Sequence, residues 1–279
     1  MLDQPFEEEE QEMSFLDHLE IFRWHIIRGL IAIAIGTIIA FIFGKQVEEI
    51  IMGPANLDFW TYRQMCALSG MLGTDALCFD SLDFTIINRR IMGKLIQHLT
   101  ISFLAGLILA FPYILFELWR FLKPALKKSE RRYLQGVVFF GSLLFFLGVS
   151  MGYFILAPIS VQFLVNYNFL NQVDNQTDLQ SYLSLISMIT LAAALVFQLP
   201  IVVYFLAKVG LVTPKAMRTH RKHALVAILA VSAIITPPDV MSQIFLTIPF
   251  FILYETSILI AANIQRKQRK QEAAEKAVQ

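Results

Sequence analysis

The densest group of ionisable side chains in this sequence lies between Phe121 and Tyr133. One carboxylate, Glu130, stands there among five cations. Pro124 cannot continue a helix, whereas Ser129 and Glu130 can begin one, which places the carboxylate near the positive end of a helix dipole. By themselves these residue types predict a charged, solvated turn that the dipole stabilises. The five cations are Lys123, Lys127, Lys128, Arg131 and Arg132.

Polar side chains within long apolar stretches form a second group of candidates, because such residues often mark a permeation, coupling or docking site. Glu255 lies well inside the last apolar stretch, and no chain of carboxylates accompanies it. The amides of Gln198 and Gln243 require hydrogen-bond partners, either within the same bundle or on a helix of another protein. Glu117 stands three residues before Arg120, which predicts an ion pair near the end of a helix.

No combination of side chains in the sequence is typical of an enzyme. None of the five histidines stands in the middle of an apolar stretch beside a serine or a carboxylate, and the common hydrolase, zinc-protease and phosphate-loop motifs are missing. Cys66 and Cys78 share one long segment without a histidine close to them. This pattern favours a disulfide over a metal site, with two free thiols as the alternative. We therefore expect neither enzymatic activity nor a metal or other cofactor.

The elements that must position these residues are membrane helices. The chain has 279 residues, of which 56% are apolar and only 16% are charged, whereas soluble domains average about 25% charged residues. The mean hydropathy of +0.59 points in the same direction. The net charge of +1 excludes a protein that binds nucleic acids mainly by electrostatic attraction, and the apolar fraction excludes a disordered chain.

The apolar stretches predict six membrane spans, since a bilayer core of about 30 Å requires about 20 apolar residues per helix. Pro237 and Pro238 interrupt the last apolar block, which is therefore predicted to form a hairpin with Asp239 as the cap of the sixth helix. The fifth span is short, roughly 18 Å, and requires a thinned bilayer or burial against its neighbours. The predicted spans are 26–43, 99–118, 136–156, 182–207, 224–235 and 241–262.

Basic residues predict the orientation of this all-helical membrane domain, which comprises residues 14–265. The connections after the second and fourth spans and the C-terminal segment are rich in Lys and Arg, whereas those after the third and fifth spans contain none. Both termini are therefore predicted to be cytoplasmic, and the long connection 44–98, with both cysteines, lies outside. The acidic residues 1–13 and the polar tail 266–279 are expected to be solvated and disordered.

Several strings of residues occur together in one known protein family. They are Phe111-Pro112-Tyr113 through Phe121-x-x-Pro124-Ala125-Leu126 with Glu130-Arg131-Arg132; Gly148 to Pro158; Phe197-Gln198-Leu199-Pro200; Thr236-Pro237-Pro238-Asp239-Val240-x-Ser242-Gln243; and His18-Leu19-x-x-x-Arg23. In this combination the sequence resembles the TatC family, the receptor subunit of the twin-arginine (Sec-independent) protein translocase. The family usually has His-Leu-x-Glu-Leu-Arg near its N-terminus. Here Ile21 occupies the glutamate position, and Glu20 precedes it by about 100° around a helix.

The resemblance implies a receptor for signal peptides with two consecutive arginines, at the core of a complex that exports folded proteins by the protonmotive force. Glu130 would bind the arginine pair, because a guanidinium offers a carboxylate a planar fork that an ammonium lacks. Phe121 would lie beside Glu130, and Glu20 and Arg23 would support the binding from the N-terminal motif.

The resemblance also implies the partners and the location. Gln243, Gln198 and Asp239 would face single-span subunits of the TatA and TatB type. Pro54 matches a structurally important outer position. The protein would lie in the cytoplasmic (inner) membrane and self-associate. A different function, that of a secondary transporter for a small solute, is the alternative, and only the receptor should co-purify with single-span proteins.

Overall fold

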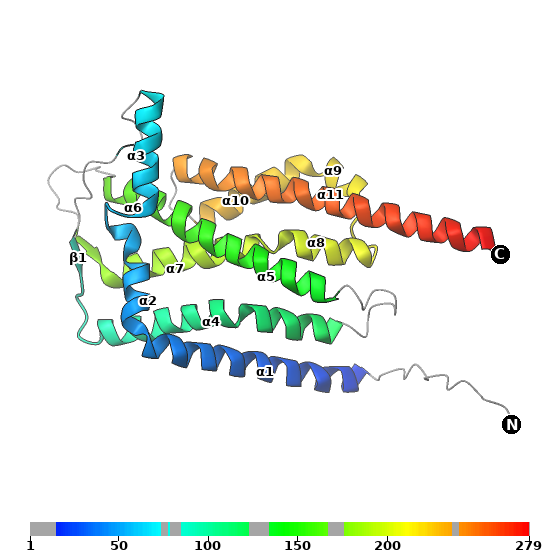
Figure 1. Ribbon diagram of the computed structural model, residues 1–279, viewed down its shortest axis with the longest axis horizontal. Helices are drawn as coiled ribbons and strands as arrows, with labels where there is room; N and C mark the ends of the chain where they lie inside the picture. Colours follow the sequence, from blue (N-terminus) through cyan, green and yellow to red (C-terminus); the bar gives the residue numbers. More distant parts are fainter. Residues whose placement is uncertain are drawn as a thin grey trace.

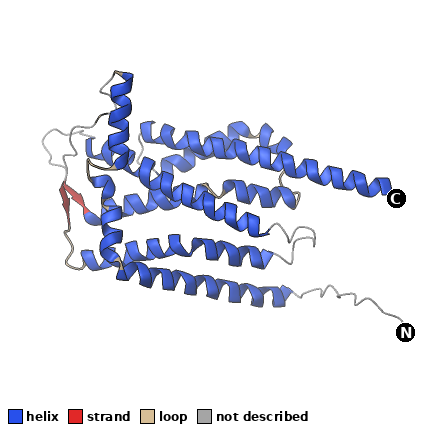
Figure 2. Ribbon diagram, in the orientation of Figure 1, coloured by secondary structure: helices blue, strands red, loops and turns tan. Residues whose placement is uncertain are grey.

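The computed structural model describes residues 15–73, 78, 85–122, 134–166, 176–235 and 240–278. Within this part of the chain, helices form an elongated bundle with two short strands at one end (Figures 1 and 2). The longer helices are α1 (Phe15–Ile42), α4 (Gly93–Leu122), α5 (Leu134–Met151), α7 (Leu179–Val196) and α11 (Val240–Val278). The shorter ones are α2 (Gly44–Ile51), the 3-10 helix η1 (Gly53–Ala55), α3 (Trp60–Leu72), the π-helical η4 (Gly152–Leu156), α6 (Ala157–Asn166), α8 (Leu199–Lys208), α9 (Pro214–Thr219) and α10 (Arg221–Ile235).

The two ends of the bundle carry different elements. Helix α1 begins and helix α11 ends on the right in Figure 1, and we call this side the termini end. The opposite side, here called the loop end, carries α2, α3 and the strands β1 (Thr85–Ile87) and β2 (Gln176–Asp178). The first and last helices thus meet the same side of the bundle, as a chain with an even number of spans requires.

Five helical stretches among the described residues are long and apolar enough to cross a membrane. The helical membrane fold that the sequence predicts is therefore confirmed. The predicted fifth span corresponds to α10, whose 15 residues extend only about 22 Å, so the count of six stays a prediction. The five stretches are Glu20–Ile42, Gly93–Phe121, Gly136–Asn166, Leu179–Lys208 and Leu246–Lys270.

Two of the stretches contain several helical segments. Helix α5 continues through η4 into α6 and reaches Asn166, well beyond the predicted end at residue 156, since Pro158 lies in the first turn of α6, where proline is tolerated. A turn at Phe197 and Gln198 separates α7 from α8, and Pro200 again stands in the first turn of the following helix. Neither proline ends its membrane segment.

The C-terminal segment differs from the sequence-based expectation. We predicted a disordered polar tail at 266–279, and this is wrong, because α11 continues as one helix to Val278. The residues after Lys270 are mostly Ala, Glu, Gln and Lys, which are strong helix formers. Their helix propensity favours continuation of the helix of the last span beyond Lys270. Residues 1–14 lie outside the described residues, as does the predicted hairpin with Pro237, Pro238 and Asp239.

Tyrosine hydroxyls hold the loop end together. Tyr62 of α3 donates to the carbonyl oxygens of Pro54 at 2.9 Å and Pro158 at 3.0 Å, and Tyr182 of α7 donates to that of Ile51 at 3.1 Å. Burial raises the pKa of the Tyr62 hydroxyl, which therefore keeps its proton and remains a donor. The side chain of Tyr62 thus joins α3 both to the fully buried Pro54 of η1 and to the beginning of α6.

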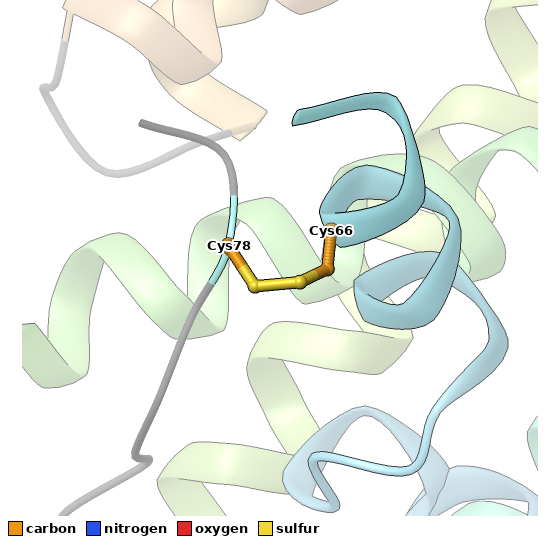
Figure 3. The surroundings of a disulfide bond; sticks show 2 residues. All are labelled: Cys66 and Cys78. Atoms are coloured by element: carbon orange, nitrogen blue, oxygen red, sulfur yellow. A yellow bond between two sulfur atoms is a disulfide. The ribbon is translucent and has the colours of Figure 1, made fainter. Parts of the chain in front are cut away.

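Two further links lie at the loop end. A disulfide joins Cys66 of α3 to Cys78, the pairing that the cysteine pattern predicts (Figure 3). Strands β1 and β2 pair in parallel with Thr85 opposite Gln176, so two connections far apart in the chain share one short ladder. The two strands lie side by side at the edge of the bundle in Figure 2. The sequence did not predict this ladder.

Candidate functional site

Helices α1 and α4 run antiparallel along one side of the bundle and touch through two glycines (Figure 1). A Cβ atom on Gly36 would lie 2.7 Å from the carbonyl oxygen of Gly106, and one on Gly106 would lie 2.4 Å from the backbone nitrogen of Thr37. The backbones therefore meet directly at this point, as small residues allow in membrane helices. Between this contact and the termini end, larger side chains line the space between the two helices.

A buried carboxylate, Glu117 of α4, lies between these helices near the termini end. Its side chain is only 4% exposed, and its carboxylate is hydrogen-bonded to Nδ1 of His25 from α1. The hydroxyl of Tyr113, one turn earlier on α4, donates to the other carboxylate oxygen at 3.0 Å. The guanidinium groups of Arg28 and Arg120 each lie 3.9 Å from the carboxylate. A negative charge in hydrocarbon thus has a histidine, a hydroxyl and two partly exposed arginines around it.

Helical spacing explains why these groups converge. His25 and Arg28 are three residues apart on α1, and Tyr113, Glu117 and Arg120 recur at four and three residues on α4, so each set lies on one face of its helix. The antiparallel packing of the two helices brings the two faces together. We call these five residues the Glu117 cluster.

An apolar groove of about 210 Å³ adjoins the Glu117 cluster. Glu117 and His25 form its polar part, and the remaining lining residues are apolar apart from Gly29. At the termini end the ring of Phe121 lies 4.9 Å from that of Phe22 and 6.1 Å from the imidazole of His25. The apolar walls are Phe22, Ile26, Leu30, Ile33, Ile114, Leu118 and Phe121.

The chemistry of this groove is that of a binding site. It offers an apolar channel for a hydrophobic segment, and beside it lies a buried carboxylate that is already hydrogen-bonded to His25 and Tyr113. Among the described residues no group of three or more His, Cys, Asp or Glu side chains could hold a metal ion. The walls of the groove suit an apolar segment of a ligand.

The structure places only some of the predicted peptide-binding residues at this groove. Phe121 closes its end, whereas Glu130 lies outside the described residues. Glu20 and Arg23 are exposed on α1, and at about 100° per residue both lie roughly opposite His25 around the helix. Ile21, at the position of the family glutamate, lies on the same side as His25. The N-terminal residues with charges thus face away from the groove.

The two amides predicted to face partner helices are hydrogen-bonded inside this chain. Gln198, in the turn between α7 and α8, donates to the carbonyl oxygen of Gly141 at 3.1 Å, while its own carbonyl oxygen is buried without a hydrogen bond. Gln243 of α11 donates to the carbonyl oxygen of Leu229 in α10, also at 3.1 Å. Both side chains are half-buried, so each lies at a junction between helices.

Glu255 has an ion-pair partner within this chain. Its carboxylate accepts a hydrogen bond from the guanidinium of Arg221 at 2.7 Å. Arg221 is the first residue of α10, so this exposed ion pair joins the start of α10 to α11. The contact lies toward the termini end.

Sequence reasoning missed the main feature of the site. We expected Glu117 to pair with Arg120 at an interface, and we found no histidine beside a carboxylate. The Arg120 contact exists at 3.9 Å, but Glu117 is buried and its closest partner is His25, 92 positions earlier. A usable signal was present, because His25 and Glu117 both stand near the cytoplasmic ends of predicted spans that are consecutive and therefore antiparallel.

Comparison with known proteins gives consistent relatives. A family model described as Sec-independent protein translocase protein (TatC) matches residues 17–249. The chain is similar to a Sec-independent protein translocase protein TatC from Blattabacterium sp. subsp. Periplaneta americana (strain BPLAN), with 38% identity over 264 residues that cover 93% of this chain and 99% of that protein. The protein of the same description from Aquifex aeolicus (strain VF5) is 33% identical, with 92% and 98% covered.

Solved structures show the same likeness. A crystal structure of the twin arginine translocase receptor TatC superposes with a TM-score of 0.68 at 31% identity, covering 89% of this chain and 99% of that one. A second crystal structure of that receptor, in DDM, gives a TM-score of 0.70 at 32% identity, with 88% and 99% covered.

Proposed function

Because this chain belongs to the TatC family of Sec-independent protein translocase proteins, we propose that it binds twin-arginine signal peptides at the termini end of its bundle. The observation that carries this proposal is the groove between α1 and α4, which combines apolar walls with a buried carboxylate and ends at Phe121. A signal peptide has a positively charged part followed by an apolar part. The groove offers a complementary surface to the apolar part.

Glu130 is the proposed partner of the arginine pair. It follows Leu122, the last residue of α4, by eight positions, so an extended chain places it within roughly 28 Å of the groove's end. Its five cationic neighbours have long side chains that can extend into water, while the shorter glutamate side chain stays closer to the backbone. The proposed site is therefore a small negative centre within a positive rim, with Phe121 beside it.

The remaining functional statements are also proposals. The termini end faces the cytoplasm, which places the Lys- and Arg-rich connections inside and the disulfide outside, in the inner membrane of a bacterium. Single-span subunits of the TatA and TatB type dock on the bundle near Gln243, Gln198 and Asp239, and the assembled complex exports folded proteins with the protonmotive force. Membership of a protein translocase family favours this function over transport of a small solute.

Peptide binding to purified variants tests the proposal. Glu130→Ala should weaken binding of a twin-arginine peptide by about 10- to 100-fold, since a hydrogen bond to a charged group contributes about 1.5–3 kcal/mol. Glu20→Ala should have a smaller effect, because Glu20 lies on the side of α1 that faces away from the groove. Glu49→Ala removes an exposed carboxylate of α2 at the loop end and serves as the matched control.

A twin-lysine version of the same peptide tests the recognition chemistry. It should bind more weakly than the twin-arginine peptide to the wild-type protein, and Glu130→Ala should reduce that preference. Normal binding with an unchanged preference for arginine in Glu130→Ala would show that Glu130 is not the receptor carboxylate. Co-purification of single-span proteins with the chain then separates the translocase from a solute transporter, which has no such partners.

A further inference from the structure

A polar cavity of about 370 Å³ at the loop end lies far from the groove of the Glu117 cluster. Residues from the first turns of three helices line it. Lys45 and Glu48 come from α2, Lys94 and His98 come from α4, and Leu179 begins α7. The N-terminal turn of a helix carries partial positive charge, so three such turns add to the lysines in favouring an anion.

Two polar side chains of α4 form part of the cavity wall. Gln97 is only 6% exposed and lines the cavity. The Nε2 atom of His98 is buried and has no hydrogen-bond partner among the described residues. Leaving buried polar atoms unpaired is costly, and native proteins usually satisfy them with a side chain, a water molecule or a ligand.

The ring of His98 is held in place by its neighbours. It stacks on Phe41 of α1 with ring centroids 4.1 Å apart. A Cβ atom on Gly44 would lie 2.0 Å from Nε2, so only a glycine at this position leaves room for the ring. The unpaired nitrogen therefore belongs to a fixed wall of the cavity.

The charges around the cavity favour an anion. Neither Lys45 nor Lys94 forms an ion pair with another described residue, and Glu48 is the carboxylate among the lining side chains. Asp178 caps the third helix start, where it accepts a hydrogen bond from the backbone of Gln180 at 3.2 Å, and it is not among the residues that line the cavity. The cavity wall therefore offers two ammonium groups and an amide against the one carboxylate of Glu48.

The position of the cavity indicates where the ligand comes from. One membrane span ends at Ile42 and the next begins at Gly93, so the cavity lies at the level where hydrocarbon meets the lipid headgroups. The neighbouring side chains of Ile42, Met92 and Leu95 are apolar and 72%, 62% and 51% exposed. They offer a surface for acyl chains directly beside the cationic cavity.

We propose that this cavity binds a phosphate group, presented by the headgroup of an anionic phospholipid in the outer leaflet. The phosphate oxygens accept hydrogen bonds from Lys45, Lys94 and the amide of Gln97, while His98 forms a fixed part of the cavity wall. Free inorganic phosphate offers the same chemistry without the acyl chains. The site is separate from the proposed peptide groove, so this inference does not depend on signal-peptide binding.

Native mass spectrometry of the full-length protein, titrated with phosphatidylglycerol or phosphatidylcholine, tests the proposal. The double variant Lys45→Gln/Lys94→Gln should bind phosphatidylglycerol about 10- to 100-fold more weakly than the wild type, since it loses two charged donors. The control Arg63→Gln/Arg90→Gln removes the same charge from exposed positions at the loop end outside the cavity and should bind like the wild type. Unchanged melting temperatures in both variants separate lost binding from lost folding.

A calorimetric titration with inorganic phosphate distinguishes the two sources. Phosphatidylglycerol binding without phosphate binding supports a lipid site, and binding of both, each lost in the lysine variant, supports a site for phosphate on any carrier. The proposal is overturned if the lysine variant and its control bind phosphatidylglycerol equally. It is also overturned if the wild type prefers phosphatidylcholine.

Discussion

The loop end and the termini end of this bundle are held together by different kinds of contact. At the loop end, neutral hydroxyls of Tyr62 and Tyr182 donate to backbone carbonyls, and a disulfide and a two-stranded ladder add further links. At the termini end, α1 and α4 are joined by ionisable side chains around Glu117, beside an apolar groove. One end is fixed by contacts that do not titrate, and the other by contacts that a charged ligand can perturb.

This difference matches the tasks of the two ends. A buried neutral hydrogen bond gains little on average but is expensive to break, so it fixes one geometry. A buried charge carries a large desolvation cost, and a bundle retains it where its chemistry is needed. The comparison teaches that the loop end forms a cap held by neutral contacts, whereas the termini end keeps a buried carboxylate with ionisable partners.

Removal of the buried carboxylate should have the largest effect. Glu117→Leu leaves His25, Arg28 and Arg120 close together without their counter-charge, and we expect a loss of about 3–5 kcal/mol, as for other broken buried pairs. Glu117→Gln keeps an acceptor for the Tyr113 hydroxyl and should lose clearly less. Thermal unfolding in detergent measures both. If the Leu variant is as stable as the wild type, the Glu117 cluster does not stabilise this end of the bundle.

Loss of the disulfide should rank second. The double variant Cys66→Ser/Cys78→Ser opens a loop with a sequence separation of 12, for which loop entropy predicts about 3 kcal/mol. We expect the loss to be local to α3 and the residues around it, so limited proteolysis should cut there first. Mass spectrometry of a non-reduced digest provides the control. If it finds two separately alkylated thiols in the wild type, the loop end lacks this link.

Removal of one hydroxyl should cost less. Tyr62→Phe deletes the donor to Pro54 and Pro158 but keeps the ring, so we expect a loss of about 1–3 kcal/mol. Stability should fall equally at every pH at which the protein is folded, because the hydroxyl does not titrate. A pH-dependent difference between Tyr62→Phe and the wild type would contradict the neutral character assigned to this end.

An amide between two helices should matter least on its own. Gln243→Leu removes the hydrogen bond to Leu229, which in a membrane is worth about 0.6–2 kcal/mol. We also expect fewer crosslinks between this part of α11 and single-span partners. Gln64→Leu changes an exposed amide of α3 and is the matched control. If the variant is less stable but its crosslinks are unchanged, the Gln243 side chain stabilises the bundle itself and does not contact a partner helix.

The two ends should also be energetically independent. Glu117 lies near the last turn of α4 and Tyr62 at the other end of the bundle, so the losses from Glu117→Gln and Tyr62→Phe should add within about 0.5 kcal/mol. The double variant in the same unfolding experiment measures the coupling. A larger interaction energy would show that the contacts of Glu117 at the termini end and those of Tyr62 at the loop end are energetically coupled.

The sequence was sufficient for most of the fold because membrane helices are specified by local composition. Apolar runs predicted the spans, although the third stretch extends to Asn166 instead of ending at residue 156. The error at the C-terminal tail came from weighing polarity above helix propensity after Lys270. The ladder between β1 and β2 could not be predicted, since three residues per strand carry no recognisable pattern.

The site was predictable only in part, because its contacts connect distant residues. The spacing of Glu117 and Arg120 correctly predicted a local pair, but no local pattern reveals that His25 lies opposite the same carboxylate. The pairing follows from the helix crossing at Gly36 and Gly106, which fixes the rotation of α1 against α4. Without that crossing, the faces of two neighbouring helices cannot be matched from sequence alone.

The ladder between β1 and β2 also sets an order of events during synthesis. Thr85 pairs with Gln176, so the first strand waits while α4, α5 and α6 are made and inserted. The partner strand β2 is available only after the ribosome has passed Asp178. Contacts between segments so far apart in the chain form slowly. The first helix pair is thus in the membrane before the cap can close. A chain that stalls during translation before this point would carry an unpaired strand at the loop end.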